Sequence, residues 1–359
     1  NLSGNEIPMG LTPASNGKLA FTTKEPIGVV VAVSAFNHPL NLIVHQVAPA
    51  VAVGCPVLVK PADDTPLSCE TFINYLYEAG LPKPWCRFVP CELEVAEKLV
   101  TDERISFFSF IGSAKVGWML RSKLANGTRC ALEHGGAAPV IIDENVNLEE
   151  IIPKLVKGGF YHSGQVCVSV QRVFAPHKEA QKISNLIGET AKFLKVGNAI
   201  FESTDCGPLI RAREVERVSN WVEEAIEEGA NLITGGKKIG ETCFSPTVLL
   251  NPSAISKVSK MEIFGPIICV YGYKNVDDAI NQANSLPYSF QSAVYTNRLD
   301  FATYVIKMLD ASAVMVNEHT AFRVDWMPFA GRKESGYGVG GIGHTMKDMT
   351  HNKMIIFNY

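Results

Sequence analysis

The feature that most constrains this chain is the regular alternation of short apolar runs with helical patterns in its first third. Runs of β-prone apolar residues are typical of strands buried on both faces, and apolar residues at three- and four-residue spacings are typical of helices packed on one side. Strands are expected at 27–36, 56–60, 87–90 and 105–110, and helices at 40–53, 67–79, 93–100 and 114–124. This order predicts a Rossmann-like α/β domain, a parallel sheet with helices on both faces.

A second region of the same kind follows, and the two ends of the chain differ from both. Strands are expected at 139–142, 172–174, 246–250, 267–270, 292–296 and 312–316, and helices at 178–193 and 214–228. The β-prone segments 19–24 and 353–359 have no helical neighbours, so we expect edge strands that need a partner. The sequence therefore predicts two α/β domains and a small β element.

Composition excludes several classes of protein. The formal net charge of −3 over 359 residues gives no reason to expect a nucleic-acid partner. The longest apolar runs are too short to span a bilayer, and the N-terminus has no signal-peptide pattern. The nine cysteines are scattered without a CxxC pair, so we expect no disulfide framework, no metal site and a reducing, cytoplasmic location.

Cys167 stands out among these cysteines because it ends the segment Gly164-Gln165-Val166-Cys167. A glycine there allows a tight turn that would place the thiol at the start of a new segment. Backbone N–H groups in such a turn would lower the pKa of the thiol and could bind an oxyanion. The alternative is a buried structural cysteine, which we expect for most of the others.

Three further segments carry groups that would complement a nucleophile. Glu133, in Leu132-Glu133-His134-Gly135-Gly136, could serve as a general base beside glycines that leave it unhindered, or it could be a solvated surface carboxylate. Asn37 follows the first long strand, where its amide could stabilise an oxyanion or merely cap a helix. Glu262-Ile263-Phe264-Gly265-Pro266 pairs a carboxylate with an aromatic ring, as ribose recognition requires, although alone it is only a turn.

Together these four segments resemble the aldehyde dehydrogenase superfamily, of the NAD(P)-dependent hydrolytic type. The resemblance runs from about Lys24 to the C-terminus and includes the segments 60–63, 109–117 and 328–336. It implies that Cys167 attacks an aldehyde and that a hydride then transfers to the nicotinamide. The loss of the hydride leaves a thioester on Cys167. Glu133 would activate the water that hydrolyses this thioester to a carboxylic acid, and Asn37 with the Cys167 N–H would hold the oxyanion.

The resemblance also assigns the cofactor contacts. It places Lys60 and Asp63 at the adenosine ribose, Gly112 and Ser113 at the pyrophosphate, and Glu262 and Phe264 by the nicotinamide ribose. A helix that begins after Gly112 would favour an anion at its N-terminus. Asp63 stands where a glutamate is usual, and a carboxylate there would repel a 2′-phosphate, so NAD is favoured while NADP remains possible.

The implied domains follow the same resemblance. We expect an N-terminal remnant at 1–17, an NAD(P)-binding domain at 27–133, a catalytic domain at 134–345, and an oligomerisation arm formed by 18–26 and 346–359. Unpaired strands in such an arm favour a homodimer or homotetramer, between which the sequence does not choose.

The implied substrate pocket contains unusually polar residues. Its members are His38, Leu42, His45, Val166, Val168, Arg323 and Phe329. Two histidines and an arginine indicate a small polar or anionic aldehyde such as a semialdehyde. Arg323 could instead pair with Asp325 and face away.

The chain also departs from the family. Many relatives carry a lysine and a glutamate near the proton path of deacylation, where this chain has Gln46 and Gly340. Losing both avoids a lone buried charge. Family members usually carry roughly another hundred residues before the point where this sequence begins, so we expect that the sequence covers only part of the native polypeptide. A truncated non-catalytic relative is one alternative, and a CoA-acylating enzyme, which often lacks the glutamate, is another. The segment 336–341 satisfies G-x-G-x-x-G, but we expect neither the strand before it nor the helix after it that a dinucleotide fingerprint requires.

Overall fold

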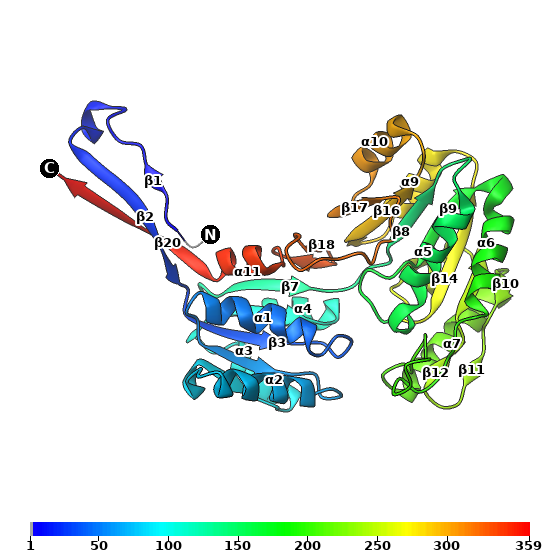
Figure 1. The fold of residues 1–359 in the computed structure, drawn as a ribbon, viewed down its shortest axis with the longest axis horizontal. Coiled ribbons are helices and arrows are strands. Elements are labelled where there is room, and N and C mark those ends of the chain that lie inside the picture. Colours follow the sequence, from blue (N-terminus) through cyan, green and yellow to red (C-terminus); the bar gives the residue numbers. More distant parts are fainter. Residues whose placement is uncertain (1–2) are drawn as a thin grey trace. The chain divides into compact units, whose positions relative to one another are not determined.

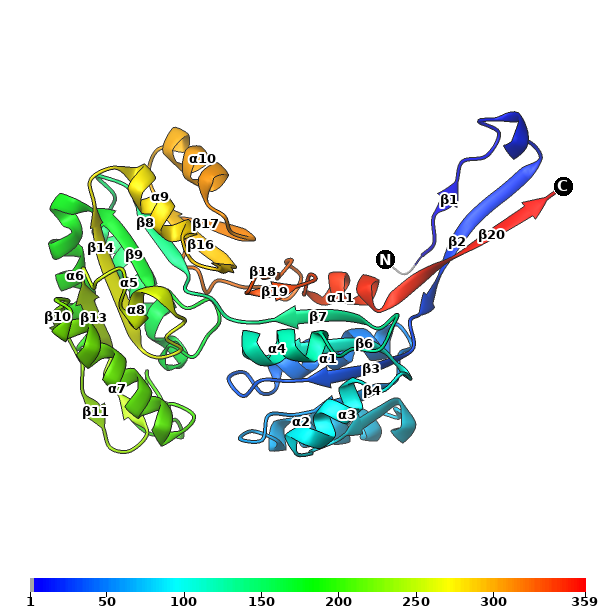
Figure 2. The same ribbon diagram turned by 180° about the vertical axis from the view of Figure 1, so that it is seen from behind.

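The computed structural model describes residues 3–359 and divides into two compact units, which are treated separately. The first unit holds the chain up to Glu133 together with Asp325–Phe329 and Tyr337–Tyr359, and the second holds His134–Val324 and Ala330–Gly336. Figures 1 and 2 show the elements of each unit from opposite sides. The unit changes at Glu133, where a domain boundary was expected, but 325–329 and 337–345, expected in the second domain, belong to the first unit.

The first unit is built on a six-stranded sheet in the order β19-β7-β6-β3-β4-β5. The strands from β7 to β5 are all parallel. Their bounds are β3 (Val29–Val33), β4 (Val57–Lys60), β5 (Cys86–Phe88), β6 (Ile105–Ile111) and β7 (Arg129–Glu133), and the short edge strand is β19 (Gly336–Tyr337). Parallel strands bring their carboxyl ends to one edge, which is where ligands bind in open α/β sheets.

Alternate residues of β3 face two separate cores, one on each side of this sheet. Val30 and Ala32 pack with α1 and α2, whereas Val31 packs with α3 and α4. The helices are α1 (Asn41–Ala52), α2 (Leu67–Glu78), α3 (Leu93–Val100) and α4 (Ala114–Arg121), with a short 3-10 turn at Lys83–Trp85. Burial on both faces explains why these strands are continuous apolar runs rather than alternating ones.

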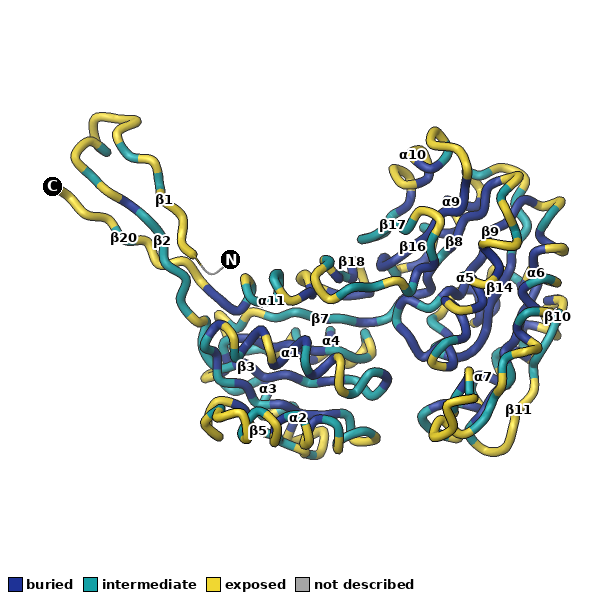
Figure 3. The backbone as a smooth tube through the Cα atoms, in the orientation of Figure 1, coloured by how far each residue is buried: buried dark blue, intermediate teal, exposed yellow. Residues whose placement is uncertain are grey.

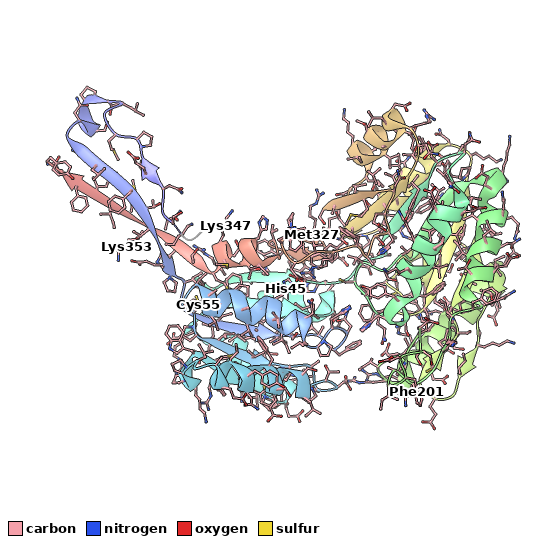
Figure 4. All side chains as sticks on the ribbon, viewed as in Figure 1. His45, Cys55, Phe201, Met327, Lys347 and Lys353 are labelled. Atoms are coloured by element: carbon pink, nitrogen blue, oxygen red, sulfur yellow. The ribbon has the colours of Figure 1, made fainter. Side chains whose placement is uncertain are left out.

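A short helix, α11 (Ile342–Asp348), follows the glycine-rich segment 336–341, so the expectation that no helix follows it was wrong. Gly341 has a φ of 99°, which turns the chain just before the helix. Met349, which ends α11, is fully buried in the core that contains α1. Its carbonyl accepts a hydrogen bond from Sγ of Cys55 at 3.3 Å, and Figure 4 labels Cys55 near α1. Tertiary packing therefore stabilises a helix too short to be stable alone.

The two β-prone ends of the chain pair with each other. Strand β2 (Lys18–Pro26) and strand β20 (Thr350–Asn358) form a long antiparallel ladder, and β1 (Glu6–Ile7) pairs with the other edge of β2. A 3-10 turn at Pro13–Ser15 lies between β1 and β2. Figure 3 shows that most of this three-stranded arm is exposed or half-buried. The segment 1–17 thus contributes a strand, although its first two residues lie outside the described residues.

The second unit is built on a seven-stranded sheet in the order β10-β13-β14-β9-β8-β16-β17. All neighbours are parallel except β10, which pairs antiparallel with β13. The strands are β8 (Pro139–Ile142), β9 (Arg172–Pro176), β10 (Asn231–Thr234), β13 (Thr247–Leu250), β14 (Ile267–Tyr273), β16 (Gln291–Tyr295) and β17 (Ala313–Val316). Two short antiparallel pairs accompany them, β11 (Lys238–Ile239) with β12 (Cys243–Phe244) and β15 (Tyr288–Ser289) with β18 (Arg332–Lys333).

Helices cover both faces of this sheet as well, which confirms the predicted α/β class. Helices α5 and α6 share one core, and α7, α9 and α10 contribute to cores that contain alternate strand residues. The helices are α5 (Leu148–Phe160), α6 (His177–Ala191), α7 (Ala212–Glu227), α8 (Lys257–Lys260), α9 (Val276–Asn284) and α10 (Leu299–Met308). No helix within residues 3–359 is long and apolar enough to cross a bilayer.

Arg172, at the start of β9, is a buried charged residue that connects separate segments of this unit through hydrogen bonds. Only 4% of it is exposed, and its guanidinium donates to the carbonyls of Ala137 (2.9 Å), Gln282 (3.0 Å) and Ala283 (3.0 Å). Burial lowers its pKa to about 10, which still leaves it charged at neutral pH. Because the carbonyl of Ala137 directly follows the glycines 135 and 136, Arg172 also fixes where that segment enters the sheet.

We expect Arg172→Met to destabilise the protein by roughly 2–5 kcal/mol, because three carbonyls, two of them in buried hydrogen bonds, lose their donors while the volume is nearly kept. Urea denaturation followed by fluorescence measures this as a lower midpoint. Arg213→Met is the matched control, since the Arg213 side chain is 70% exposed and should leave the midpoint nearly unchanged. Equal midpoints for both variants would contradict a structural role for Arg172.

Candidate active site

Cys167 follows a left-handed turn, a conformation that L-residues rarely adopt. The turn consists of residues three to five positions before Cys167, whose φ angles are 57° at His162, 54° at Ser163 and 67° at Gly164. Non-glycine residues held there cost about 1–3 kcal/mol each, and such strain gathers at functional sites. The Ser163 hydroxyl donates to the Gly207 carbonyl at 2.5 Å, which helps to hold the strained turn. The thiol is therefore presented by a backbone that the surrounding fold keeps in place.

Gln165 supplies the second anchor of this turn. Its buried side-chain amide donates to the Pro208 carbonyl (3.2 Å) and accepts from the Ile210 N–H (2.9 Å). A further turn follows, in which the Ser169 N–H donates to the Val166 carbonyl at 3.0 Å. Cys167 in this second turn is half-buried, whereas six of the nine free cysteines are buried. The glutamine of the Gly-Gln-x-Cys motif thus positions the backbone and leaves the thiol accessible.

Gly164 must be a glycine because another predicted segment passes against it. A Cβ at this position would lie 2.1 Å from the Gly265 carbonyl oxygen, closer than any real contact. The neighbouring Phe264 has a φ of 51°, again in the left-handed region. The structure therefore packs the cysteine motif directly on the segment that carries Glu262 and Phe264.

The glycines that follow Glu133 lie close to the Glu262 carboxyl and to the backbone of Cys167. A Cβ on Gly135 would meet the Glu262 carboxyl at 1.7 Å, and the Gly136 N–H donates to Oε1 of Glu262 at 3.3 Å. The Cβ position of Gly136 is 3.8 Å from the Cys167 carbonyl oxygen. A side chain at Gly135 would exclude the carboxyl, so this glycine creates the place that Glu262 occupies, whereas a Cβ on Gly136 would make only ordinary contacts.

Burial raises the pKa of the Glu262 carboxyl to about 8, while the Gly136 N–H and the charge of Arg217 act in the opposite direction. Arg217 is itself bonded to Glu214 (2.7 Å) and to the Ile263 carbonyl (2.8 Å), so it compensates Glu262 only in part. The carboxyl is therefore protonated in a large fraction of molecules near neutral pH. In that form it can donate as well as accept hydrogen bonds, which suits a sugar diol.

Tyr161 is a group near the thiol to which sequence reasoning assigned no role. Burial, and to a smaller extent the charge of Cys167, raise the pKa of its phenol to about 12, while Arg323 acts in the opposite direction. Arg323 lies in a loop that is fixed to the cysteine turn, since the Thr320 hydroxyl donates to the Val168 carbonyl at 2.7 Å. The phenol and the guanidinium therefore lie in the electrostatic neighbourhood of Cys167, together with Val166 and Val168. A tyrosine six residues before the nucleophile was the available sequence signal.

The remaining site residues belong to the first unit, and most of them follow the carboxyl ends of its parallel strands. Asn37 follows β3, Lys60 ends β4, and Glu133 ends β7. Gly112 and Ser113 follow β6 directly. Parallel strands thus bring together residues that are far apart in the sequence, at the edge where ligands bind.

The Gly112 N–H takes part in the sheet. It donates to the Glu133 carbonyl at 3.1 Å and so helps to hold the end of β7. Ser113 is the residue before the first turn of α4, and its side chain makes no capping bond. The N–H groups that follow Ser113 are the ones suited to an anion at this helix N-terminus.

Lys60 and Asp63 are brought together as an ion pair between the Lys60 ammonium and Oδ1 of Asp63. The lysine side chain is 6% exposed and the aspartate side chain 62% exposed, so the pair has a buried cation and an accessible carboxylate. Such a carboxylate can accept ribose hydroxyls. The ion pair and the helix N-terminus, both in the first unit, are groups of the kind that bind a ribose and a phosphate.

The predicted pocket residues of the first unit are fixed by polar contacts. Nε2 of His45, on α1, lies 2.9 Å from Oδ1 of Asp325, and Figure 4 labels His45 and the nearby Met327. His45 is 9% exposed, whereas the Asp325 side chain is 58% exposed. Phe329 is 3% exposed and forms a backbone bridge with Gly340. His38 is half-buried just before α1.

All nine cysteines are free thiols. Over the described residues, no group of three histidine, cysteine, aspartate or glutamate side chains is arranged to hold a metal ion.

Comparison with known proteins covers nearly the whole chain. Residues 1–355 match the model of the aldehyde dehydrogenase family. The chain is 37% identical over 358 residues to 3-sulfolactaldehyde dehydrogenase of Priestia aryabhattai, covering 99% of this chain and 75% of that relative.

Two solved structures are similar over both units. One is aldehyde dehydrogenase 21 of Physcomitrella patens in complex with the reaction product succinate (TM-score 0.95, 34% identity, 99% of this chain and 74% of that chain). The other is glyceraldehyde-3-phosphate dehydrogenase GapN of Methanocaldococcus jannaschii complexed with NADP (TM-score 0.94, 35% identity, 100% of this chain and 78% of that chain). The predicted class, an NAD(P)-dependent oxidoreductase, is confirmed, and the chain belongs to the aldehyde dehydrogenase family.

Proposed function

We propose that this enzyme oxidises a small anionic aldehyde to a carboxylic acid through a thioester on Cys167. The observation that carries the proposal is the strained, doubly anchored turn that presents this thiol beside the glycine segment and the Glu262 carboxyl. The Cys167 thiolate adds to the carbonyl carbon, and the carbonyl oxygen becomes an oxyanion that backbone N–H groups can stabilise. NAD(P)⁺ supplies the hydride acceptor of the next step, in which the oxyanion collapses to the thioester.

Glu133 and Asn37 complete the proposed mechanism from the strand ends of the first unit. Glu133 takes a proton from water, the resulting hydroxide adds to the thioester carbon, and the C–S bond breaks to release the acid and the thiolate. The buried Asn37 amide donates to the oxyanion in both half-reactions. This route needs no CoA, because water is the acyl acceptor.

Cys167→Ala should abolish NAD(P)H formation, because no other group here supplies a nucleophile. Cys130→Ala is the matched control, since Cys130 is likewise half-buried, and it should retain activity close to that of the native protein. The readout is NAD(P)H absorbance over a panel of aldehydes, together with product analysis with and without CoA. Retained activity in Cys167→Ala would contradict the thioester mechanism, and acyl-CoA as the main product would favour the CoA-acylating alternative.

An anionic substrate is supported by the cationic and hydroxyl groups near the thiol. Arg323 and the Tyr161 phenol could bind a carboxylate, sulfonate or phosphate while the aldehyde end reaches Cys167. The similar proteins point in the same direction. One is named for sulfolactaldehyde, one for glyceraldehyde-3-phosphate, and one holds succinate as its product, and all three compounds carry an anionic group.

Arg323→Ala should raise KM for succinic semialdehyde about 10- to 100-fold, because a charged hydrogen bond contributes roughly 1.5–3 kcal/mol. Propanal, which has no anionic group, serves as the internal control and should show a change of less than about threefold. Steady-state kinetics on both aldehydes give the two values. An equal rise for both substrates would contradict recognition of the anion by Arg323.

The cofactor preference is proposed to be NAD, because Asp63 both accepts ribose hydroxyls and occupies the buried Lys60. Replacing Asp63 with serine removes the carboxylate that repels a 2′-phosphate and frees the Lys60 ammonium to attract it. The ratio of kcat/KM for NADP to that for NAD should then rise about tenfold, corresponding to roughly 1.4 kcal/mol. A ratio that stays constant would show that Asp63 does not set the preference.

We also propose a homo-oligomer assembled through the arm. Strand β20 is an edge of its sheet, and its exposed apolar residues are Met354, Ile356 and Phe357. An exposed, apolar edge strand is a surface that proteins normally cover, and a second copy can extend the same sheet. The nine free thiols suit a reducing compartment, so the cytoplasm is the proposed location.

A further inference from the structure

Gly340 lies unusually close to the carboxylate of Glu133. A Cβ on Gly340 would be 2.3 Å from Oε1 of Glu133 and 2.9 Å from the Phe329 carbonyl oxygen, whereas real Cβ contacts essentially never fall below 3.0 Å. The carboxylate therefore lies in space that any side chain at position 340 would fill.

We propose that Gly340 is a positioning residue for the general base. Because it has no side chain, it leaves the Glu133 carboxylate the room to occupy its working position. The inference rests on the proposed role of Glu133 in hydrolysing the thioester. In this proposal Gly340 affects the rate of thioester hydrolysis without contributing a functional group, because it acts only through the space that it leaves for Glu133.

The backbones on both sides of this contact are fixed. The Phe329 N–H donates to the Gly340 carbonyl at 3.0 Å, and the Gly340 N–H donates to the Phe329 carbonyl at 2.7 Å. Glu133 pairs with Ile111 in the sheet, and its carbonyl accepts from the Gly112 N–H at 3.1 Å. Since neither backbone can withdraw, a methyl group at position 340 must displace the carboxylate.

Ordinary backbone strain does not account for this glycine. Gly340 is not among the glycines with positive φ, so an L-residue could adopt its conformation. The glycine is required by the close approach alone. This makes an alanine substitution a test of space rather than of backbone conformation.

Gln46 is bonded to the strands of the same sheet. Its buried amide donates to the Val33 carbonyl (3.2 Å), the Ser109 carbonyl (3.1 Å) and the Ser109 hydroxyl (3.0 Å). These bonds occupy the amide N–H₂ with sheet residues and place no cation at this position.

The experiment compares Gly340→Ala with the matched variant Gly343→Ala in α11, where an added Cβ meets nothing within 4 Å. Stopped-flow absorbance separates the first burst of NAD(P)H from the steady state, which reports deacylation when hydrolysis is slow. A misplacement of about 1 Å can cost two orders of magnitude in rate. We therefore expect Gly340→Ala to keep the burst and to lower the steady-state rate roughly 10- to 100-fold, and Gly343→Ala to match the native enzyme.

Glu133→Ala and the double variant Glu133→Ala/Gly340→Ala show whether Gly340 acts through Glu133. If it does, Gly340→Ala causes no further loss of rate once the carboxylate is gone. The same factor of loss in both backgrounds, or a Gly340→Ala rate equal to that of Gly343→Ala, would overturn the proposal.

Thermal unfolding provides a readout that does not need activity. The crowding should lower the melting temperature of Gly340→Ala, and removing the Glu133 side chain should restore part of it in the double variant. Absence of any restoration would overturn the inferred contact even if the single variant folds poorly. If instead the native enzyme and Gly343→Ala form no NAD(P)H, the proposed function fails while the thermal cycle still tests the contact.

Discussion

The constraint on which this site depends is the absence of a side chain at Gly135. Without a Cβ there, the Glu262 carboxyl reaches the Gly136 N–H, and the Cβ position of Gly136 lies 3.8 Å from the Cys167 carbonyl oxygen. Arg172 fixes the next carbonyl, that of Ala137, from inside the sheet. A buried cation, the glycine segment and the Glu262 carboxyl thus form one chain of contacts. The strained turn before Cys167 is held against this support by Gly164.

The parallel sheet of the first unit brings together candidate site residues that come from four distant points of the sequence. Strand order places Asn37, Lys60, Gly112 and Glu133 along one edge. The bond from the Gly112 N–H to the Glu133 carbonyl shows that neighbouring strand ends also stabilise one another. Gly112 therefore helps to fix the backbone of the proposed general base, and the N–H groups that open α4 are suited to an anion.

The sequence predicted the strands well, because burial on both faces makes them continuous apolar runs, as at β3 and β8. It missed α5, where Pro153 and the glycines 158 and 159 weaken the helical pattern while Leu155 and Phe160 pack into the core. It missed α11 for a similar reason, since a seven-residue helix is stabilised by α1 rather than by its own residues. The motifs identified the candidate residues, but the Glu262 pKa and the bond between His45 and Asp325 depend on distances that no local pattern encodes.

Gly340 shows the limit of reading residues by the groups they carry. As a glycine it offers no functional group, so a search for nucleophiles, bases and cations passes over it. The structure changes the argument, because a Cβ at this position would lie 2.3 Å from Oε1 of Glu133. A charged side chain placed there would fill the same space and would add the desolvation cost of a further ion. The absence of a side chain is therefore itself a feature that can determine where a carboxylate lies.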